Sequence, residues 1–226
     1  MDIKRLQGYK ATRPQGLIGK KVLITAGPTW VPIDSVRVIS NISTGQTGIL
    51  LAQRLQGLGA KVTLILGPVE CCCLDRGIKI IRFRFFGELK EIIRQALSAK
   101  KYDIFIHSAA VSDYRLKKQY ADKIKSGRNN LKLLLTPTEK IINSVKKMQR
   151  GIFLVGFKFE PGARKYELIK STNLLIKRAH LDLAVANTIS GGHYQAFLLT
   201  RNKINGPLFS KEILVRALVH SIIQFN

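Results

Sequence analysis

The stretch ITAGPTWVPIDSVRVISNISTGQTG, from Ile24 to Gly48, joins a buried strand to a helix through a long loop. Strand-to-helix loops in α/β folds usually contain about 2–6 residues. Here the chain turns at Gly27-Pro28 and reaches the helix only at a second glycine pair, Gly45 and Gly48. A long ordered loop is more typical of a binding loop than of a simple connector, and disorder is the alternative explanation.

Short apolar runs alternate with segments of helical periodicity along the rest of the chain. The expected strands are 21–25, 61–66, 78–83, 103–109, 151–159 and 181–187, with a further candidate at 131–135. The expected helices are 49–58, 88–99, one that begins at 136–139, 161–179 and 210–225. This alternation predicts a three-layer, Rossmann-like α/β domain with a mainly parallel sheet. We expect residues 1–19 to be a polar lead-in and residues 20–226 to form a single domain.

The composition is that of an ordinary globular protein, with 46% hydrophobic and 23% charged residues. The sequence has no apolar run of about 18 residues, and its first residues lack the apolar centre of a signal peptide. We therefore expect a cytoplasmic protein with no membrane partner. Cys71, Cys72 and Cys73 are consecutive and lack a metal-ligand spacing, which favours a reduced, thiol-bearing loop over a metal or redox site.

The net charge of +24, from 38 Lys and Arg against 14 Asp and Glu, would attract polyanions. Nucleic acid and phosphorylated small molecules are both candidates. The basic residues are spread along the chain, however, and no nucleic-acid-binding motif accompanies them. A solvated basic surface is the favoured interpretation, we expect no nucleic-acid partner, and the reason for the charge stays open.

Ligands of open α/β sheets bind beyond the carboxyl ends of the strands, where two loops stand out. The first, SNISTGQTG, places Ser43, Thr44 and two glycines at a helix entrance, where free N–H groups suit a phosphate. Asn41 would add an amide and Arg37 a charge. A simple helix cap is an equally good interpretation of the same residues.

The second loop, SAAVSDYR, directly follows the strand at 103–109. Ala109 and Ala110 are small enough for a ligand to approach the backbone. Asp113 offers a carboxylate for a magnesium ion or a hydroxyl, although a cap or turn is an even alternative. Further on, DKIKSGR brings Lys123 and Lys125 together as a phosphate clamp or as a solvated charge run.

The motifs VLITAGPTWVPIDSVRVISNISTGQTG, AAVSDYR…DKIKSG, VGFKFE and LDLAVAN resemble, in order and spacing, those of the phosphopantothenate–cysteine ligase family. This family forms the ligase half of the bifunctional coenzyme A biosynthesis flavoprotein. The resemblance runs from about Lys20 to beyond Asn187 and implies no flavin. It implies that the 4′-phosphopantothenate carboxylate attacks the α-phosphate of CTP, or of ATP, with Mg²⁺. The cysteine amine then displaces the nucleoside monophosphate. It also implies a homodimer with a substrate site completed across the subunit interface.

The resemblance assigns roles to individual residues. Asn41 matches the asparagine that contacts phosphopantothenate and its acyl intermediate, and Lys123 matches the catalytic lysine of a mobile flap. The substrate-binding candidates are Asn41, Arg37, Gly45, Ala109 and Ala110. The nucleotide-binding candidates are Gly27, Asp113, Lys123, Lys125, Phe157, Lys177 and Arg178, and Asp113 is also the candidate metal ligand.

Some family positions differ in this chain. Trp30 and Gln46 stand where the family commonly has Arg and Lys. Two lysines that serve the triphosphate in the family correspond to Leu175 and Ala179, with Lys177 and Arg178 beside them. A shift of one residue on a helix rotates a side chain by about 100°.

Two other functions compete with the ligase. One is a non-catalytic ligase-like module that holds nucleic acid or phosphorylated ligands on its basic surface. The loss of the two triphosphate lysines favours this module, whereas the intact Asn41, Asp113 and Lys123 favour the ligase. A nicotinamide-dependent reductase is disfavoured because the glycine fingerprint of a dinucleotide site is missing.

Overall fold

The computed structural model describes residues 17–70, 76–99, 101–127 and 130–225. The lead-in before residue 17 and the cysteines at 71–73 lie outside these residues. The strands are β1 (Lys21–Ala26), β2 (Trp30–Pro32), β3 (Val38–Ser40), β4 (Lys61–Leu66), β5 (Lys79–Arg82), β6 (Ile104–His107), β7 (Tyr114–Leu116), β8 (Leu135–Pro137), β9 (Phe153–Phe159), β10 (Leu183–Ser190), β11 (His193–Leu199) and β12 (Ile204–Leu208). The helices are α1 (Gln46–Gly57), α2 (Phe86–Ala99), α3 (Ile142–Met148), α4 (Lys165–Ala179) and α5 (Lys211–Phe225).

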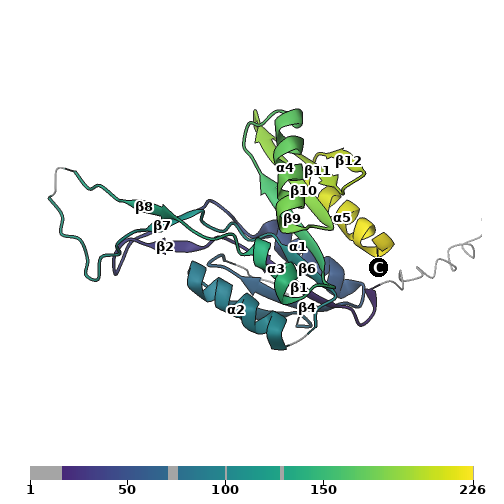
Figure 1. The fold of residues 1–226 in the computed structure, drawn as a ribbon, viewed down its shortest axis with the longest axis horizontal. Coiled ribbons are helices and arrows are strands. Elements are labelled where there is room, and N and C mark those ends of the chain that lie inside the picture. Colours follow the sequence, from purple (N-terminus) through teal and green to yellow (C-terminus); the bar gives the residue numbers. More distant parts are fainter. Residues whose placement is uncertain (1–16, 71–75, 100, 128–129, 226) are drawn as a thin grey trace, which may run out of the picture.

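Within the described part of the chain, eight strands form one sheet in the order β12-β11-β10-β9-β6-β1-β4-β5 (Figure 1). Every neighbouring pair from β10 across to β5 is parallel. At the other end of this sheet, β11 pairs antiparallel with both β10 and β12. The predicted mainly parallel α/β sheet is therefore confirmed. Because each helix after a parallel strand runs back along the sheet, the carboxyl ends of the parallel strands lie along one side of the sheet and their amino ends along the opposite side. We call these two sides the carboxyl edge and the amino edge, as distinct from the edge strands β12 and β5.

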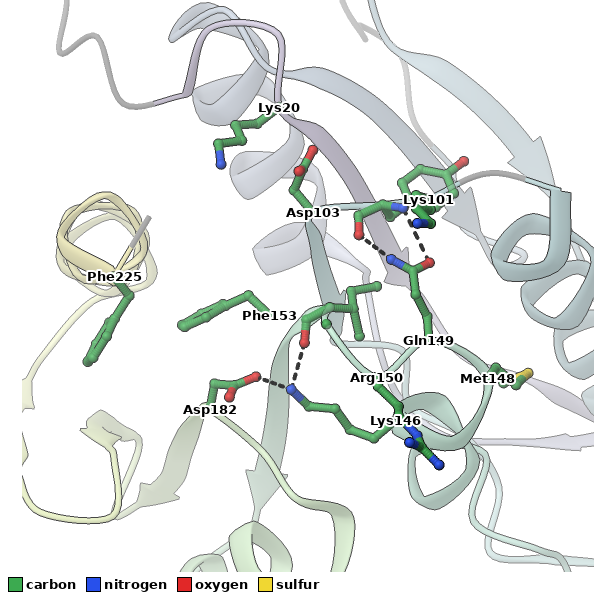
Figure 2. A pocket seen from close by; sticks show the side chains of 13 residues that line it. Lys20, Lys101, Asp103, Lys146, Met148, Gln149, Arg150, Phe153, Asp182 and Phe225 are labelled. Atoms are coloured by element: carbon green, nitrogen blue, oxygen red, sulfur yellow. Dashed lines mark hydrogen bonds and ion pairs between the residues drawn. The ribbon is translucent and has the colours of Figure 1, made fainter.

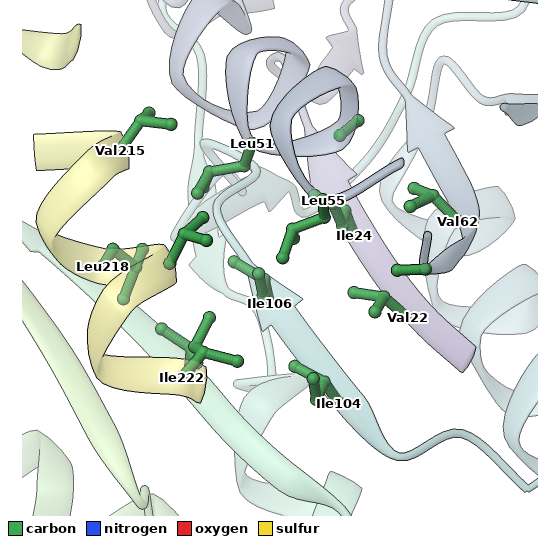
Figure 3. Packing of buried hydrophobic residues seen from close by; sticks show 14 of the residues in the cluster. Val22, Ile24, Leu51, Leu55, Val62, Ile104, Ile106, Val215, Leu218 and Ile222 are labelled. Atoms are coloured by element: carbon green, nitrogen blue, oxygen red, sulfur yellow. The ribbon is translucent and has the colours of Figure 1, made fainter. Parts of the chain in front are cut away.

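Helices cover both faces of the sheet. On one face α1 and α5 pack against alternate residues of the central strands, as Figure 3 shows for Leu55 and Leu218 against Ile24 and Ile106. On the other face α2, α3 and α4 form a second core with the intervening residues, such as Leu23. Full burial of each such aliphatic side chain contributes about 1.5–3 kcal/mol, so both faces hold the central strands in place.

The long loop after β1 is ordered and contains the hairpin β2–β3. A second hairpin, β7–β8, joins it in an arm that projects from the sheet (Figure 1). We define the arm as residues 30–40, 113–127 and 130–137.

The helix expected to begin at 136–139 is wrong, because residues 135–137 form strand β8 and α3 begins at Ile142. Thr138 explains the difference, since its hydroxyl and N–H donate to the carbonyls of Ser112 (2.7 Å) and Asp113 (2.9 Å). These distant hydrogen bonds hold the segment against the residues before β7. Of the candidate strand at 131–135, only Leu135 is in a strand.

No helix in the described residues is long and apolar enough to cross a membrane.

His107 at the end of β6 is a buried core residue. Its Nδ1 lies 2.8 Å from Thr25 Oγ1, and its ring meets Phe105 edge to face with centroids 5.6 Å apart. Burial lowers the pKa of His107 to about 4, so the folded protein holds this ring neutral.

We predict that His107 makes the fold acid-sensitive. The unfolded chain takes up a proton as the pH falls below about 6.5, whereas the folded chain does not until about pH 4. This stability is present above pH 6.5 and is lost as the pH falls toward 4. Between pH 7.5 and 5.5 the loss should be about 1 kcal/mol, measured by guanidinium unfolding.

His107→Asn should remove this part of the pH dependence, because asparagine does not titrate. The control His220→Asn, at an exposed histidine, should keep it. Equal losses in the His107 variant and the unsubstituted protein would contradict the assignment.

Candidate functional site

Several backbone segments meet closely at the carboxyl end of β1. Gly27 and Gly45 both have left-handed backbones, with φ of 81° and 69°. A Cβ on Gly27 would lie 3.2 Å from the Gly67 nitrogen, and one on Gly45 would lie 3.2 Å from the Gly27 nitrogen. The loops after β1 and β4 and the start of α1 therefore touch, and side chains at these positions would separate them.

The loop after β6 closes the same group. The Ala110 N–H donates to the Gly27 carbonyl at 2.9 Å, and the Ala110 carbonyl accepts from Thr29 N–H at 3.2 Å. The exposed Asn41 side chain also donates to that carbonyl, with Nδ2 3.0 Å away. The structure thus brings together Asn41, Gly27, Gly45 and Ala110, with Ala109 beside them, as one small-residue platform.

The start of α1 opens onto this platform. Gly45 is its N-cap, and no side chain of the described residues caps the helix. Ser43 Oγ and Thr44 Oγ1 accept only from Gly45 N–H and Gln46 N–H, both at 3.4 Å. Apart from Gln46 N–H, with its long bond to Thr44, the first N–H groups of the helix have no side-chain acceptor among the described residues. They therefore stay available to an anion, which favours the phosphate interpretation over the cap.

Asp34, which the sequence analysis did not single out, joins the two segments of the arm through hydrogen bonds. Its side chain is fully covered and accepts from Val36 N–H (2.9 Å), Arg37 N–H (2.8 Å) and Ile124 N–H (3.1 Å). Burial by itself raises the pKa of Asp34. These backbone hydrogen bonds and the Arg37 guanidinium outweigh burial and lower the pKa to about 2. The carboxylate therefore stays charged at neutral pH.

Arg37 adds an ion pair and two hydrogen bonds to this cluster. Its Nη1 pairs with Asp34 at 2.6 Å, and its guanidinium donates to the Ile124 carbonyl at 3.3 and 3.4 Å. The Ile124 side chain is buried, while Lys123 and Lys125 on either side are exposed. The structure thus holds both lysines at the turn end of the β2–β3 hairpin, whereas Asn41 lies just past its base.

Asp113 lies at the start of the arm and forms an ion pair with Lys140. Its carboxylate is largely exposed, and the described residues contain no group of three His, Cys, Asp or Glu that could hold a metal ion. Asp113 therefore offers one carboxylate. This fits a magnesium ion that takes most of its ligands from phosphates and water.

The other nucleotide candidates divide between the two edges of the sheet. Phe157 lies half-buried near the carboxyl end of β9. Lys177 and Arg178 occupy the last turn of α4, which leads into Leu181 and the amino end of β10. The structure therefore does not bring this pair to the platform, because α4 runs antiparallel to the strands. Leu175 and Ala179 are buried in the core.

Two pairs of interacting residues in the site were not predicted from the sequence, because the members of each pair lie far apart along the chain. Asp34 and Ile124 are 90 residues apart, and Asp113 and Lys140 are 27 apart. One local signal exists in PIDSVR, where an aspartate precedes N–H groups two and three residues later, as in an Asx turn.

Comparisons with known proteins all find relatives of one family. Residues 17–225 match the model of the family described as DNA/pantothenate metabolism flavoprotein C-terminal domain. The chain is 44% identical over 177 residues to the coenzyme A biosynthesis bifunctional protein CoaBC of Thermococcus kodakarensis, covering 78% of this chain and 43% of that protein. With the protein of the same name from Vibrio cholerae it shares 36% identity over 220 residues, covering 92% and 53%.

The chain spans about half the length of these relatives. A crystal structure of the DNA/pantothenate metabolism flavoprotein from Streptococcus pneumoniae has the same fold, with a TM-score of 0.83 and 27% identity. That match covers 92% of this chain and 100% of the other. The family resemblance predicted from the sequence motifs is confirmed.

We predict that Asp34→Asn loosens the segment that carries the two lysines. An amide presents an N–H₂ group to one of the N–H donors that the carboxylate now accepts, so at least one hydrogen bond is lost. Hydrogen exchange at the Ile124 amide should become about tenfold faster or more.

Asp122→Asn is the matched control, because this neighbouring aspartate is exposed. It should leave exchange at Ile124 unchanged. Equal exchange in the Asp34 variant and the unsubstituted protein would mean that the carboxylate does not hold the segment.

Proposed function

Because the chain belongs to the DNA/pantothenate metabolism flavoprotein C-terminal domain family, we propose that it is a phosphopantothenate–cysteine ligase of coenzyme A biosynthesis. The observation that supports this most directly is the platform at the carboxyl end of β1. There the Asn41 amide, the open start of α1 and the small Ala109 and Ala110 adjoin one another. We expect the reaction to occur in the cytoplasm.

The proposed reaction has two steps. A carboxylate oxygen of 4′-phosphopantothenate attacks the α-phosphorus of a nucleoside triphosphate, and pyrophosphate leaves. The cysteine amine then attacks the acyl carbon, the nucleoside monophosphate leaves, and the amine loses a proton as the amide forms. Among the two nucleotides we favour CTP over ATP, and no flavin takes part.

The chemistry of the first step explains the residues that surround the site. An anionic carboxylate approaching a triphosphate is repelled, so catalysis needs cations and fixed N–H donors more than an acid–base pair. We assign the reacting phosphate to Lys123, with Lys125 beside it. The Asn41 amide and the start of α1 at Gly45 would hold the substrate.

On the nucleotide side, Gly27 would border the triphosphate and Phe157 the base. Asp113 would contribute one carboxylate to a magnesium ion carried by the triphosphate, which would reduce the charge that the attacking carboxylate meets. Lys177 and Arg178 are left out of this site because they lie at the other edge of the sheet.

A homodimer would complete the site. Within one chain Lys123 and Lys125 lie on the projecting arm, held at the far end of the hairpin from Asn41. The arm, together with Ile42 just beyond β3, also exposes many large apolar side chains: Val36, Val38, Ile39, Ile42, Tyr114, Leu131, Leu134 and Leu135. Such an exposed apolar surface is typical of a protein interface. We propose that a second copy covers it and receives the lysines.

We predict that Lys123→Gln slows pyrophosphate release at least about 100-fold, because it removes a cation from the reacting phosphate. The assay contains magnesium, 4′-phosphopantothenate, cysteine and either CTP or ATP, and it follows pyrophosphate directly. Release should depend on phosphopantothenate and should be faster with CTP.

Lys118→Gln, at another exposed lysine of the arm, should keep a near-normal rate. Near-normal release from the Lys123 variant would remove that residue from catalysis. No release with either nucleotide, from a folded dimeric protein, would favour a non-catalytic module that binds phosphorylated ligands.

We predict that Leu134→Asp converts the dimer to a monomer, since a charge would have to be buried in the apolar interface. Light scattering should give twice the 25.3 kDa of one chain for the unsubstituted protein and 25.3 kDa for the variant. Phe209→Asp, at an exposed apolar residue outside the arm, should remain dimeric. A dimer that persists in the Leu134 variant would place the interface elsewhere.

A further inference from the structure

A cleft of about 660 Å³ lies at the amino-terminal edge of the sheet, opposite the platform (Figure 2). Its walls come from the residues before β1 and β6, the turn between α3 and β9, the entry to β10 and the end of α5. Its volume is in the range of small-molecule sites. None of the residues assigned to the ligase reaction lines it.

Cations dominate the lining of this cleft. Lys20, Lys101 and Arg150 line it, and no carboxylate of the described residues forms an ion pair with them. Lys146 differs, since its Nζ lies 2.7 Å from Asp182 and 2.6 Å from the Ile152 carbonyl. Three cations are therefore left for a ligand.

The two carboxylates in the cleft are used by the fold. Asp103 Oδ2 accepts from Lys21 N–H at 2.7 Å. Asp182 Oδ2 accepts from Leu154 N–H at 2.7 Å as well as from Lys146. Asp103 anchors the first residue of β1 and Asp182 the second residue of β9, so both carboxylates have a structural explanation that the three cations lack.

Two aromatic rings form an apolar part of the same cleft. Phe153 and Phe225 lie with ring centroids 5.7 Å apart and planes inclined by 33°, and Figure 2 shows the Phe153 side chain extending toward Phe225. Phe225 is 56% exposed although it is a large apolar side chain. A flat ring with an attached anion matches both parts of the cleft, which is the chemistry of a nucleotide.

Basic residues continue along this edge beyond the cleft. They begin three neighbouring strands, end the helices that return there and fill the adjoining loops: Lys20, Lys21, Arg54, Lys61, Lys79, Lys101, Lys146, Lys147, Arg150, Lys177 and Arg178. Six parallel strands, from β5 to β10, extend about 24 Å along the edge.

The helix dipole explains only part of this pattern. Cations in the last turn of a helix are favourable in any fold, which accounts for Lys146, Lys147 and Lys177. It does not account for Lys21, Lys61 and Lys79, which begin strands and are exposed there.

We propose that this amino-terminal edge binds single-stranded nucleic acid, with one base against Phe153 and Phe225 and phosphates on Lys20, Lys101 and Arg150. A basic path with an aromatic platform is the usual way to bind single strands without sequence preference. The path extends well beyond the cleft, so a polymer uses cations that a free nucleotide leaves unpaired. This function is independent of the proposed ligase reaction at the other edge. It differs from the expectation of no nucleic-acid partner, which rested on the spread of basic residues along the sequence and not on their position in the fold.

The test is fluorescence anisotropy of a labelled fifteen-residue oligo(dT) with the full chain at increasing salt. Phe225→Ala should weaken binding about tenfold, and Phe225→Trp should restore it. Lys20→Gln combined with Arg150→Gln should weaken binding and reduce the salt slope by about 1.4, since single strands lose about 0.7 per phosphate contact.

The control combines Arg164→Gln with Lys165→Gln, an exposed pair at the start of α4 on the opposite edge. It should bind as the unsubstituted protein does. Pyrophosphate release should persist in the Phe225 variant, which separates this proposal from the ligase.

Three results would overturn the proposal. The first is no binding at low salt, and the second is an equal loss in the control pair. The third is displacement of the oligonucleotide by thymidine monophosphate at an equal nucleotide concentration, because the site would then hold a free nucleotide and not a strand.

Discussion

The close approach of backbone segments at the carboxyl end of β1 is the constraint on which the site depends. Gly27, Gly45 and Gly67 let three loops touch, and a Cβ on Gly48 would lie 2.5 Å from the Ala26 Cβ. Even one added methyl group must therefore displace a loop or α1. This contact brings the start of α1 beside Ala110, and Asn41 then bonds the Ala110 carbonyl. The open start of α1 is thus positioned by backbone packing, without any long side chain.

The two edges of the sheet carry different kinds of residues. At the carboxyl edge small residues and backbone groups gather, which suits the close and fixed donors that the proposed reaction requires. At the amino edge lysines and arginines extend into solvent around Phe225. Helices that return to the amino edge place some of the chain's basic residues there, and strand-initial lysines such as Lys61 add others.

Local patterns in the sequence predicted the parallel strands and most helices, because apolar periodicity reports directly on burial. They also predicted Asn41, Gly45 and Ala110 at one edge, since loops after parallel strands must meet there. The hairpins were missed because strands of three residues carry no periodicity. The residues Thr136–Glu139 have the pattern of a helix start, but Thr138 donates a hydrogen bond to Ser112 and holds the segment in another conformation. A partner so distant in sequence leaves no local signal.

The central position of β1 also has a consequence for how the chain folds. Lys21 begins the strand early in the sequence, but its neighbour β6 arrives 82 residues later, and β9 must follow to flank β6. During synthesis β1 can first pair only with β4. Closing the middle of the sheet waits for about 160 residues and large loops, which makes folding slow relative to a helical bundle of equal size. Until then one side of β1 stays open to pairing with other chains, so we expect the half-synthesised chain to be the form most prone to aggregation.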